Sequence, residues 1–398
     1  MPKINHMITI AIDATHSAFH FYSMIGDDKQ SITHQIKNYS GELFSDEFWE
    51  KFRTAVKDFT VYAPSETMRK ITVLLPDSAV LTDTVKIPAM RGLGQAQKTL
   101  DNTLGGFYRN YSDLQVSAAL VSQNKLYSIF AISAVQKRIA AEIYTACSEN
   151  HLLVETLTYA SSAAAGAVTA LNPKLRKSSF LLLDIKDVYS RFVFVAGGKA
   201  VGCYTLPFGL EFLRKPKVTQ EDMLFDHSYG ELVVLNAKEK AKSKKLTVMA
   251  AEDEAEAEAE AEVETVAEEV APEENASPDK KPLKIFTRKL PRKLPKFMLR
   301  EAPETREGVM YENFRVFVKW ALSLITGNER LTSIGAPECV YVNLPSDMAL
   351  VIDMANREGD SLVPFARLDF KSEDMVISNN LELYGGFCGA YIAASSKF

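Results

Sequence analysis

The sequence has few cysteines, and none of them lie close together. The four cysteines of the 398-residue chain are Cys147, Cys203, Cys339 and Cys388, and no Cys-x-x-Cys pair occurs. Structural zinc sites use closely spaced cysteines, and a chain of this length can bury a core without disulfide cross-links. We therefore expect reduced thiols, no disulfide framework and no metal site.

The sequence also lacks a long uncharged apolar run. No window approaches the roughly 18 residues that a membrane-spanning helix needs. Lys3 is the only lysine or arginine before the first apolar strand. This N-terminal segment is far short of a secretory signal peptide. These absences predict a cytoplasmic protein, and a peripheral position at the inner face of the cell membrane would need a partner or a charged surface.

An excess of positive charge is absent overall but present locally. The formal net charge is −5, which argues against nucleic-acid binding. Residues 252–274 form an acidic run with twelve acidic residues, whereas residues 280–300 form a basic block with nine basic residues. Such blocks bury too little apolar surface to order the chain, so 247–306 is predicted to be a disordered insert. A helical Glu-Ala segment is the alternative, and the basic block could contact anionic lipid or an acidic partner.

One pattern of strands and turns occurs twice in the sequence. Residues 8–13 and 180–184 are apolar runs that end in aspartate, and a polar turn and a second apolar run follow each of them. A glycine-containing turn and a third run complete both units, which is typical of a strand followed by a hairpin. Two such units about 170 residues apart indicate two similar lobes that face one another across a cleft.

The remaining pattern alternates between helix and strand, which predicts an α/β protein. The expected helices are 46–59 (with Ser45 as N-cap), 93–108, 134–150, 161–171, 218–235, 311–325 and 346–355. The expected strands outside the duplicated units are 70–75, 80–87, 115–122, 126–134, 154–159 and 339–342.

The duplicated unit resembles the actin-like ATPase superfamily, which includes actin, sugar kinases and the bacterial FtsA and PilM families. The most specific match is 73–88, where a Leu-Pro-Asp-Ser turn leads into a strand that ends at Pro88, as in the PilM family. Leu-Pro-Phe-Gly at 206–209 and the Ala- and Lys-rich pattern at 237–242 follow in the family's order. No C-terminal membrane helix of the FtsA kind is evident, which favours the PilM family.

The resemblance implies a two-lobed actin-like (ribonuclease H-like) fold with duplicated mixed-sheet domains. On this basis the domain boundaries, including a small subdomain inserted in the first lobe, fall as follows. The first lobe comprises 1–77 and 156–177, the small subdomain 78–155, and the second lobe 178–246 and 307–398.

The resemblance also implies where a nucleotide would bind. The superfamily holds ATP and Mg²⁺ between two Asp-x-Gly turns, since glycine lets backbone N–H groups approach phosphate closely. In this chain the implied nucleotide-binding residues are Asp13, Thr15, Ser17, Asp184, Lys186, Ser190, Gly385 and Gly386. Asp13 and Asp184 would hold Mg²⁺ through water molecules.

Three departures argue against an intact nucleotide site. Thr15 stands where the first turn needs glycine, and the second turn, 184–191, has none and places Tyr189 in the space of a phosphate. Pro345 follows the strand at 339–342, where the superfamily has a Gly-Gly adenosine loop. The sequence therefore predicts a pseudo-ATPase without catalytic residues.

In a pseudo-ATPase the candidate residues have ordinary structural roles. Asp13 and Asp184 would be strand-end residues that accept hydrogen bonds from turn amides. His16 and His20 would be single polar residues of the first turn rather than catalysts.

By resemblance, the function is that of a non-catalytic scaffold in a type IV pilus assembly or type II secretion-like machine. PilM-family proteins bind the cytoplasmic N-terminal tail of a bitopic inner-membrane partner, PilN, which implies a PilN-like partner here and pilus motor or platform proteins as further ones. Membrane contact would be indirect or through the basic block at 280–300. Two alternatives stay open: an active actin-like ATPase or sugar kinase, and an FtsA-like cell-division protein.

Overall fold

The computed structural model describes most of the two predicted lobes. The described residues are 6–14, 16–25, 33–61, 69–90, 93–107, 111–206, 208–216, 305–326, 331, 334–358, 363–368, 381–383 and 385–386. Thr15, the helix predicted at 218–235 and all but the last two residues of the predicted insert lie outside these ranges. No helix within the described ranges is both long enough and apolar enough to cross a membrane.

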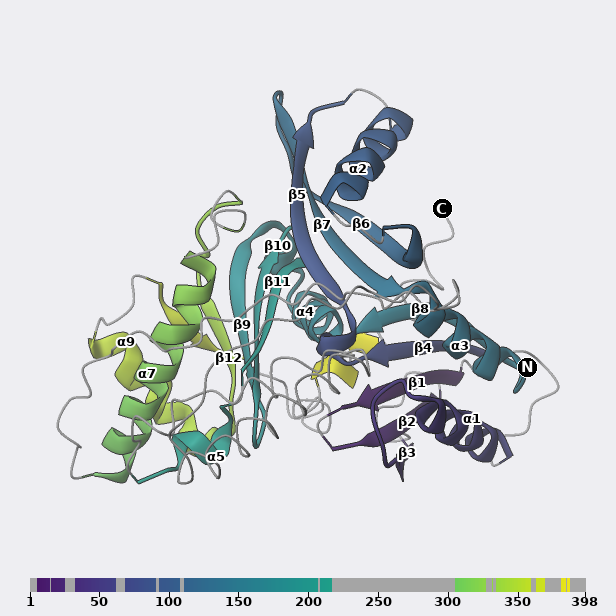
Figure 1. Cartoon of the computed structure of the whole chain (residues 1–398). Coiled ribbons are helices and arrows are strands. Elements are labelled where there is room, and N and C mark those ends of the chain that lie inside the picture. The colour runs from purple at the N-terminus through teal and green to yellow at the C-terminus, as the bar shows by residue number, and fades with distance from the viewer. Residues whose placement is uncertain are drawn as a thin grey trace, which may run out of the picture. The chain divides into compact units, whose positions relative to one another are not determined.

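The first sheet has five strands in the order β3-β2-β1-β4-β8 (Figure 1). They are β1 (His6–Asp13), β2 (Ala18–Ile25), β3 (Thr33–Asn38), β4 (Arg69–Leu75) and β8 (Leu152–Tyr159). β1 is antiparallel to β2 and parallel to β4. Successive residues of both central strands, such as Thr9 with Ile10 and Thr72 with Val73, are buried, as expected where both faces of a sheet are covered.

The helices of the first lobe are α1 (Asp46–Val61), α3 (Lys137–Ser148) and α4 (Ala160–Leu171). Ser45 caps α1 as predicted, because its Oγ accepts a hydrogen bond from the Phe48 N–H at 3.2 Å. Aromatic rings hold α1 on the sheet: the ring centroids of Phe48 and Phe52 lie 5.2 and 5.3 Å from that of Phe19 on β2.

The second sheet repeats the topology of the first, in the order β11-β10-β9-β12-β13. Its strands are β9 (Ser179–Ile185), β10 (Ser190–Ala196), β11 (Lys199–Leu206), β12 (Val340–Asn343) and β13 (Phe365–Arg367). β9 is antiparallel to β10 and parallel to β12, as β1 is to β2 and β4. The predicted duplication is thus present strand for strand.

The helices of the second lobe are α5 (Leu210–Leu213), α7 (Arg306–Thr326) and α9 (Ala349–Glu358). α7 begins earlier than the predicted residue 311, because the Oγ1 of Thr305 accepts a hydrogen bond from the Gly308 N–H at 3.1 Å and caps the helix. The predicted insert, 247–306, therefore includes the start of this helix.

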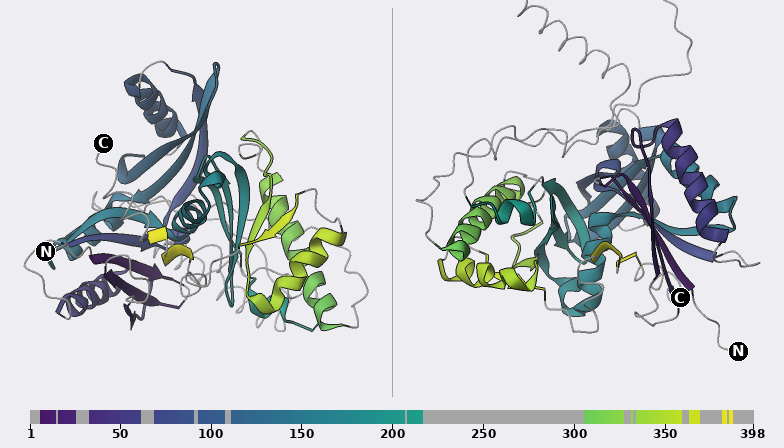
Figure 2. Two further views of the ribbon diagram at one scale, coloured as in Figure 1. Left: turned by 180° about the vertical axis from the view of Figure 1, so that it is seen from behind. Right: turned by 90° about the horizontal axis from the view of Figure 1, so that it is seen from below.

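Helix α4 joins the two sheets (Figures 1 and 2). Its buried residues Ala164 and Ala167 belong to one apolar cluster with Phe180 of β9 and Val193 of β10. The small side chains of this helix allow the second sheet to approach it closely. Both lobes therefore share part of one core.

The small sheet has three strands in the order β5-β7-β6. Its elements are β5 (Leu81–Pro88), α2 (Leu93–Phe107), β6 (Leu114–Gln123) and β7 (Tyr127–Gln136). The inserted segment ends nearer Gln136 than the predicted residue 155, because β8 pairs with β4 from Leu152 onward. Strand periodicity cannot show which sheet a strand joins.

Four 3₁₀ turns complete the described structure. They are η2 (Asp77–Ala79), η3 (Tyr111–Asp113), η4 (Pro173–Lys177) and η6 (Ser346–Met348).

Candidate functional site

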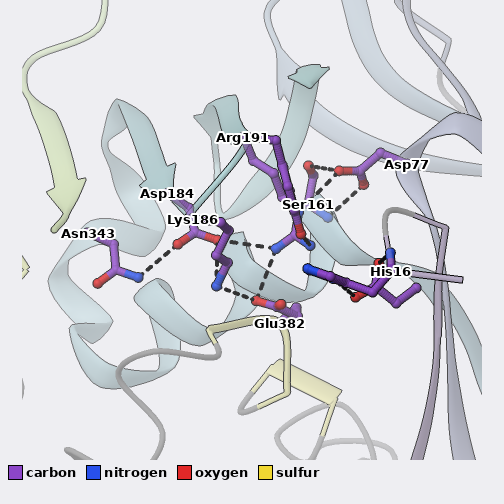
Figure 3. Close-up of polar contacts among 10 residues, drawn as sticks. His16, Asp77, Ser161, Asp184, Lys186, Arg191, Asn343 and Glu382 are labelled. Carbon is purple, nitrogen blue, oxygen red and sulfur yellow. Dashed lines mark hydrogen bonds and ion pairs between the residues drawn. The ribbon is translucent and has the colours of Figure 1, made fainter. Parts of the chain in front are cut away.

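The two aspartates predicted at strand ends lie at equivalent places in the two sheets. Asp13 is the last residue of β1, and Asp184 is the last but one of β9. Beside Asp184 lies a group of charged side chains, drawn in Figure 3, that we call the ion network: Asp77, Asp184, Lys186, Arg191 and Glu382.

Arg191 on β10 is the centre of the ion network. Its Nη1 lies 3.2 Å from the Oδ2 of Asp184 and 3.0 Å from the Oε2 of Glu382, and its Nε lies 3.4 Å from the Oδ2 of Asp77. Its Nη2 donates to the hydroxyl of Tyr189 at 2.8 Å. Although burial opposes the charge, Glu382 and the other acidic groups raise the pKa of Arg191 well above its usual value. One guanidinium thus pairs with three carboxylates.

Asp184 is fully buried, and both of its carboxylate oxygens have partners. Oδ1 accepts a hydrogen bond from the Asn343 Nδ2 at 2.8 Å, whereas Oδ2 faces Arg191 and the Nζ of Lys186, the latter at 3.3 Å. Asn343 ends β12, two residues before Pro345, so the segment where the superfamily has its adenosine loop supplies a partner for the second aspartate.

Glu382 brings the C-terminal part of the chain into the ion network. Its Oε2 lies 3.2 Å from the Nζ of Lys186, a residue 196 positions away in the sequence. Burial opposes ionisation, but the charges of Arg191 and Lys186 outweigh it and hold the pKa of Glu382 at about 2. Glu382 is therefore ionised at neutral pH.

Asp77 connects the ion network to the first lobe. Its carboxylate accepts hydrogen bonds from the N–H and the Oγ–H of Ser161, near the start of α4, at 2.8 and 2.7 Å. Burial raises the pKa of Asp77, and the charge of Arg191 and the bonds from Ser161 offset this only in part. The contact between Asp77 and Arg191 is an ionic link between the lobes.

Gly385 and Gly386, predicted to bind nucleotide, lie in close contact with the first lobe. A Cβ on Gly385 would lie 1.8 Å from the carbonyl oxygen of Ala163 in α4, and one on Gly386 would lie 2.8 Å from the Cγ2 of Thr9 in β1. No side chain fits at either position, so the two glycines let the segment that carries Glu382 approach the first lobe.

Backbone hydrogen bonds join the second turn to the start of α5. The carbonyl oxygens of Lys186 and Asp187 accept hydrogen bonds from the N–H groups of Leu210 and Glu211, at 2.8 and 3.0 Å, which are the first amides of α5. The hydroxyl of Ser190 donates to the carbonyl oxygen of Phe208. The Ser190 hydroxyl and the N–H groups of Lys186, Leu210 and Glu211, which could donate to a phosphate here, already have acceptors.

The first turn is lined by histidines. Asp13 Oδ1 accepts a hydrogen bond from the His16 N–H at 3.2 Å, as expected for a strand-end aspartate, and Oδ2 lies 2.8 Å from the His16 Nδ1 and 3.5 Å from the His20 Nε2. Burial opposes ionisation of Asp13, but His20 and His16 hold its pKa far below the usual range. Ser17 in this turn has a φ of +49°, and its carbonyl accepts a bond from the Tyr39 N–H.

His16 and His20, predicted as polar residues of the first turn rather than catalysts, do not stand alone there. Both lie on the carboxylate of Asp13, and the Nε2 of His34 on β3 lies 2.9 Å from the His20 Nδ1. The pairing of Tyr22 with His34 in the β2–β3 ladder brings this third histidine to the turn. Within the described residues no group of His, Cys, Asp and Glu is arranged to hold a metal ion.

Four residues of the site have no signal in the sequence that marks their role. Asp77 lies in the Leu-Pro-Asp-Ser turn that matched the PilM family, and Arg191 begins a predicted strand, yet nothing local says that they meet. Glu382 and His34 reach the site through distant segments. The one usable signal would have been an arginine and an acidic residue both predicted to be buried, because buried charges need partners.

Comparisons with known proteins agree with the fold. No family model matches the chain, and no curated protein matches it. Among solved structures, a PilM–PilN type IV pilus biogenesis complex matches with a TM-score of 0.54 and 14% identity, covering 98% of this chain and 99% of the other. The predicted two-lobed actin-like fold, with PilM as its structural neighbour, is confirmed.

Two further structures match more loosely. EutJ from Carboxydothermus hydrogenoformans matches with a TM-score of 0.35 and 9% identity, covering 96% of this chain and 89% of the other. The cytoplasmic domain of EpsL, an inner-membrane component of the type II secretion system of Vibrio cholerae, matches with a TM-score of 0.34 and 13% identity, covering 51% and 71%.

Proposed function

We propose that the chain is a non-catalytic actin-fold scaffold in a type IV pilus assembly or type II secretion-like machine. The ion network is the observation that carries the non-catalytic part of this proposal. It lies at the second strand-end turn, where an actin-like ATPase would hold phosphates, and its cations already serve carboxylates.

The charges of the ion network disfavour a bound Mg·ATP. Three carboxylates and two cations leave a net charge of 2 − 3 = −1 when all five are ionised. A triphosphate would have to break buried ion pairs and leave Glu382 and Asp184 uncompensated, which is costly in a buried site. A Mg²⁺ ion at Asp184 would also face Lys186 and Arg191, so ATP and Mg²⁺ do not fit these residues.

Titration calorimetry with Mg·ATP tests the non-catalytic role. We expect no heat of binding with the full-length chain. Micromolar binding that disappears in Asp13→Ala or Asp184→Ala would overturn the proposal and support the alternative, an active actin-like ATPase or sugar kinase.

The proposed partner is the cytoplasmic tail of a PilN-like bitopic membrane protein, with pilus motor or platform proteins as further partners. Support comes from the PilM–PilN complex, which this chain matches over nearly its whole length. We infer a cytoplasmic protein held at the inner face of the cell membrane by such a tail.

A tail peptide from a bitopic membrane protein encoded beside this chain provides the test. We expect saturable binding of the labelled peptide, with a scrambled peptide of the same composition as control. Equal binding of both peptides, or none, together with diffuse fluorescence of the tagged chain in cells, would contradict this role. Pelleting into filaments and location at the septum would favour an FtsA-like division protein instead.

A further inference from the structure

Three neighbouring segments form a surface that carries positive charge and no negative charge. They are η4, the turn between β10 and β11 with Lys199, and residues 120–127 at the end of β6 and in its turn to β7. They contain five basic residues and no acidic one, and we call these five the basic face: Lys125, Lys174, Arg176, Lys177 and Lys199.

Backbone contacts hold the three segments together. A Cβ on Gly198 would lie 3.7 Å from the carbonyl oxygen of Arg176, so the turn rests against η4. A Cβ on Gly197 would lie 2.9 Å from the carbonyl oxygen of Val121, at the irregularity in the pairing of β6. Gly197 and Gly198 have φ angles of +57° and +71°, which suit glycine. The basic face is thus built on three segments whose backbones lie in contact.

The cations of the basic face have no partner within the part of the chain that the structure describes. All five side chains are exposed, and none forms a hydrogen bond or an ion pair there. Exposed cations elsewhere in the first lobe, such as Lys37 and Arg138, do have carboxylate partners. Glu338, whose N–H bonds the carbonyl of Ser179 close to η4, forms no ion pair with the basic face.

An apolar side chain accompanies these cations. Leu126, next to Lys125 in the turn between β6 and β7, is 78% exposed, more than any other large apolar side chain in the described ranges. Anionic lipid surfaces attract cations beside an exposed leucine. The headgroup phosphates pair with the cations, and the apolar side chain is buried in the membrane interface.

We propose that the basic face binds the anionic headgroups of a phospholipid membrane. The charges are spread over three turns rather than converging on one point, which suits a surface of many phosphates. The exposed Leu126 favours a membrane over an acidic protein segment. The contact differs from the tail site of the proposed function and does not rest on it, and the test below uses no partner peptide.

Co-sedimentation of the full chain with vesicles tests this membrane contact. The vesicles contain phosphatidylglycerol and phosphatidylcholine in equal parts, or phosphatidylcholine alone. The test variant replaces four cations of the basic face: K174Q, R176Q, K177Q and K199Q. The control variant removes the same charges from exposed positions elsewhere: K51Q, K57Q, K98Q and R357Q.

The wild type and the control should bind the phosphatidylglycerol vesicles, and salt should weaken binding. The test variant should bind on the order of 600-fold more weakly, since each of its four lost cations strengthens binding to an anionic surface about fivefold. An equal loss in both variants, or full binding by the test variant, would overturn the proposal. Retention by an immobilised peptide of residues 252–274 without any vesicle binding would also overturn it and assign the basic face to an acidic protein segment.

Discussion

The turn after Asp13 and the turn after Asp184 follow equivalent strands of two equivalent sheets, yet their surroundings differ. The Asp13 side chain is 22% exposed and is held by histidines, whereas that of Asp184 is 0% exposed and is held by Lys186 and Arg191. A duplicated framework of strands therefore does not fix the chemistry at the strand ends. The neighbours that later segments supply decide it.

The difference has a consequence for how each turn responds to change. The second turn shares its cations with Asp77 of the first lobe and with Glu382, so a change there should be felt by the whole fold. The first turn lies beside His34, whose pKa is lowered from 6.5, so it should respond to pH below that value. Four predictions, from the largest expected effect to the smallest, test this contrast.

Replacement of Arg191 by methionine should have the largest effect. Arg191→Met keeps much of the volume but leaves three carboxylates, one fully and two largely buried, without their shared cation. Breaking a buried ion pair costs about 3–5 kcal/mol. Urea denaturation should show this loss in the free energy of unfolding. Arg138→Met, which breaks an exposed pair with Asp46, is the control and should change little. Equal stability of the two variants would mean that the ion network does not hold the lobes.

Glu382 should control stability in acid. Its pKa of about 2 lies below the usual 4.5, so its contribution is complete above pH 4.5 and is lost as the pH falls toward 2. This contribution is roughly 3 kcal/mol, and protonation of Asp77 offsets it in part, because the pKa of Asp77 is raised. Glu382→Gln should flatten the fall in stability between these pH values. Thermal unfolding at a series of pH values would measure it. The exposed Glu50→Gln should keep the wild-type profile, and an unchanged profile in Glu382→Gln would contradict the assignment.

A methyl group at position 385 should destabilise the fold, because Gly385 lies directly against α4. Gly385→Ala would place a Cβ 1.8 Å from the carbonyl of Ala163, and overpacking of this kind costs about 1–3 kcal/mol. Gly106→Ala, in α2, is a matched control with nothing within 4 Å, and it should stabilise slightly because alanine favours a helix. Differential scanning calorimetry should show opposite shifts, and equal midpoints would show that the C-terminal segment does not pack on α4.

Local sequence patterns were sufficient for the framework but not for the site. The sequence was enough to predict the apolar runs that end in Asp13 and Asp184, the cap at Ser45 and the missing glycines of both turns. Each of these depends on residues close together in the chain. The partners of Asp184 could not be predicted from the sequence, since Arg191, Asn343 and Glu382 meet only after both halves of the second lobe have folded. The close packing of Gly385 and Gly386 on the first lobe was not predicted either, because a glycine pair does not reveal which group it approaches.

The histidines of the first turn should give the smallest effect, in a different pH range. Burial and the neighbouring His20 lower the pKa of His34 below its usual 6.5, so the neutral form is favoured in the fold. The stability from His34 is therefore present above pH 6.5 and is lost as the pH falls through its folded pKa. An NMR titration should find its midpoint below 6.5, and His20→Asn should move it upward, because one of the two causes is removed. A midpoint that does not move would mean that burial alone acts on His34. A midpoint at or above 6.5 would contradict the lowered pKa of His34.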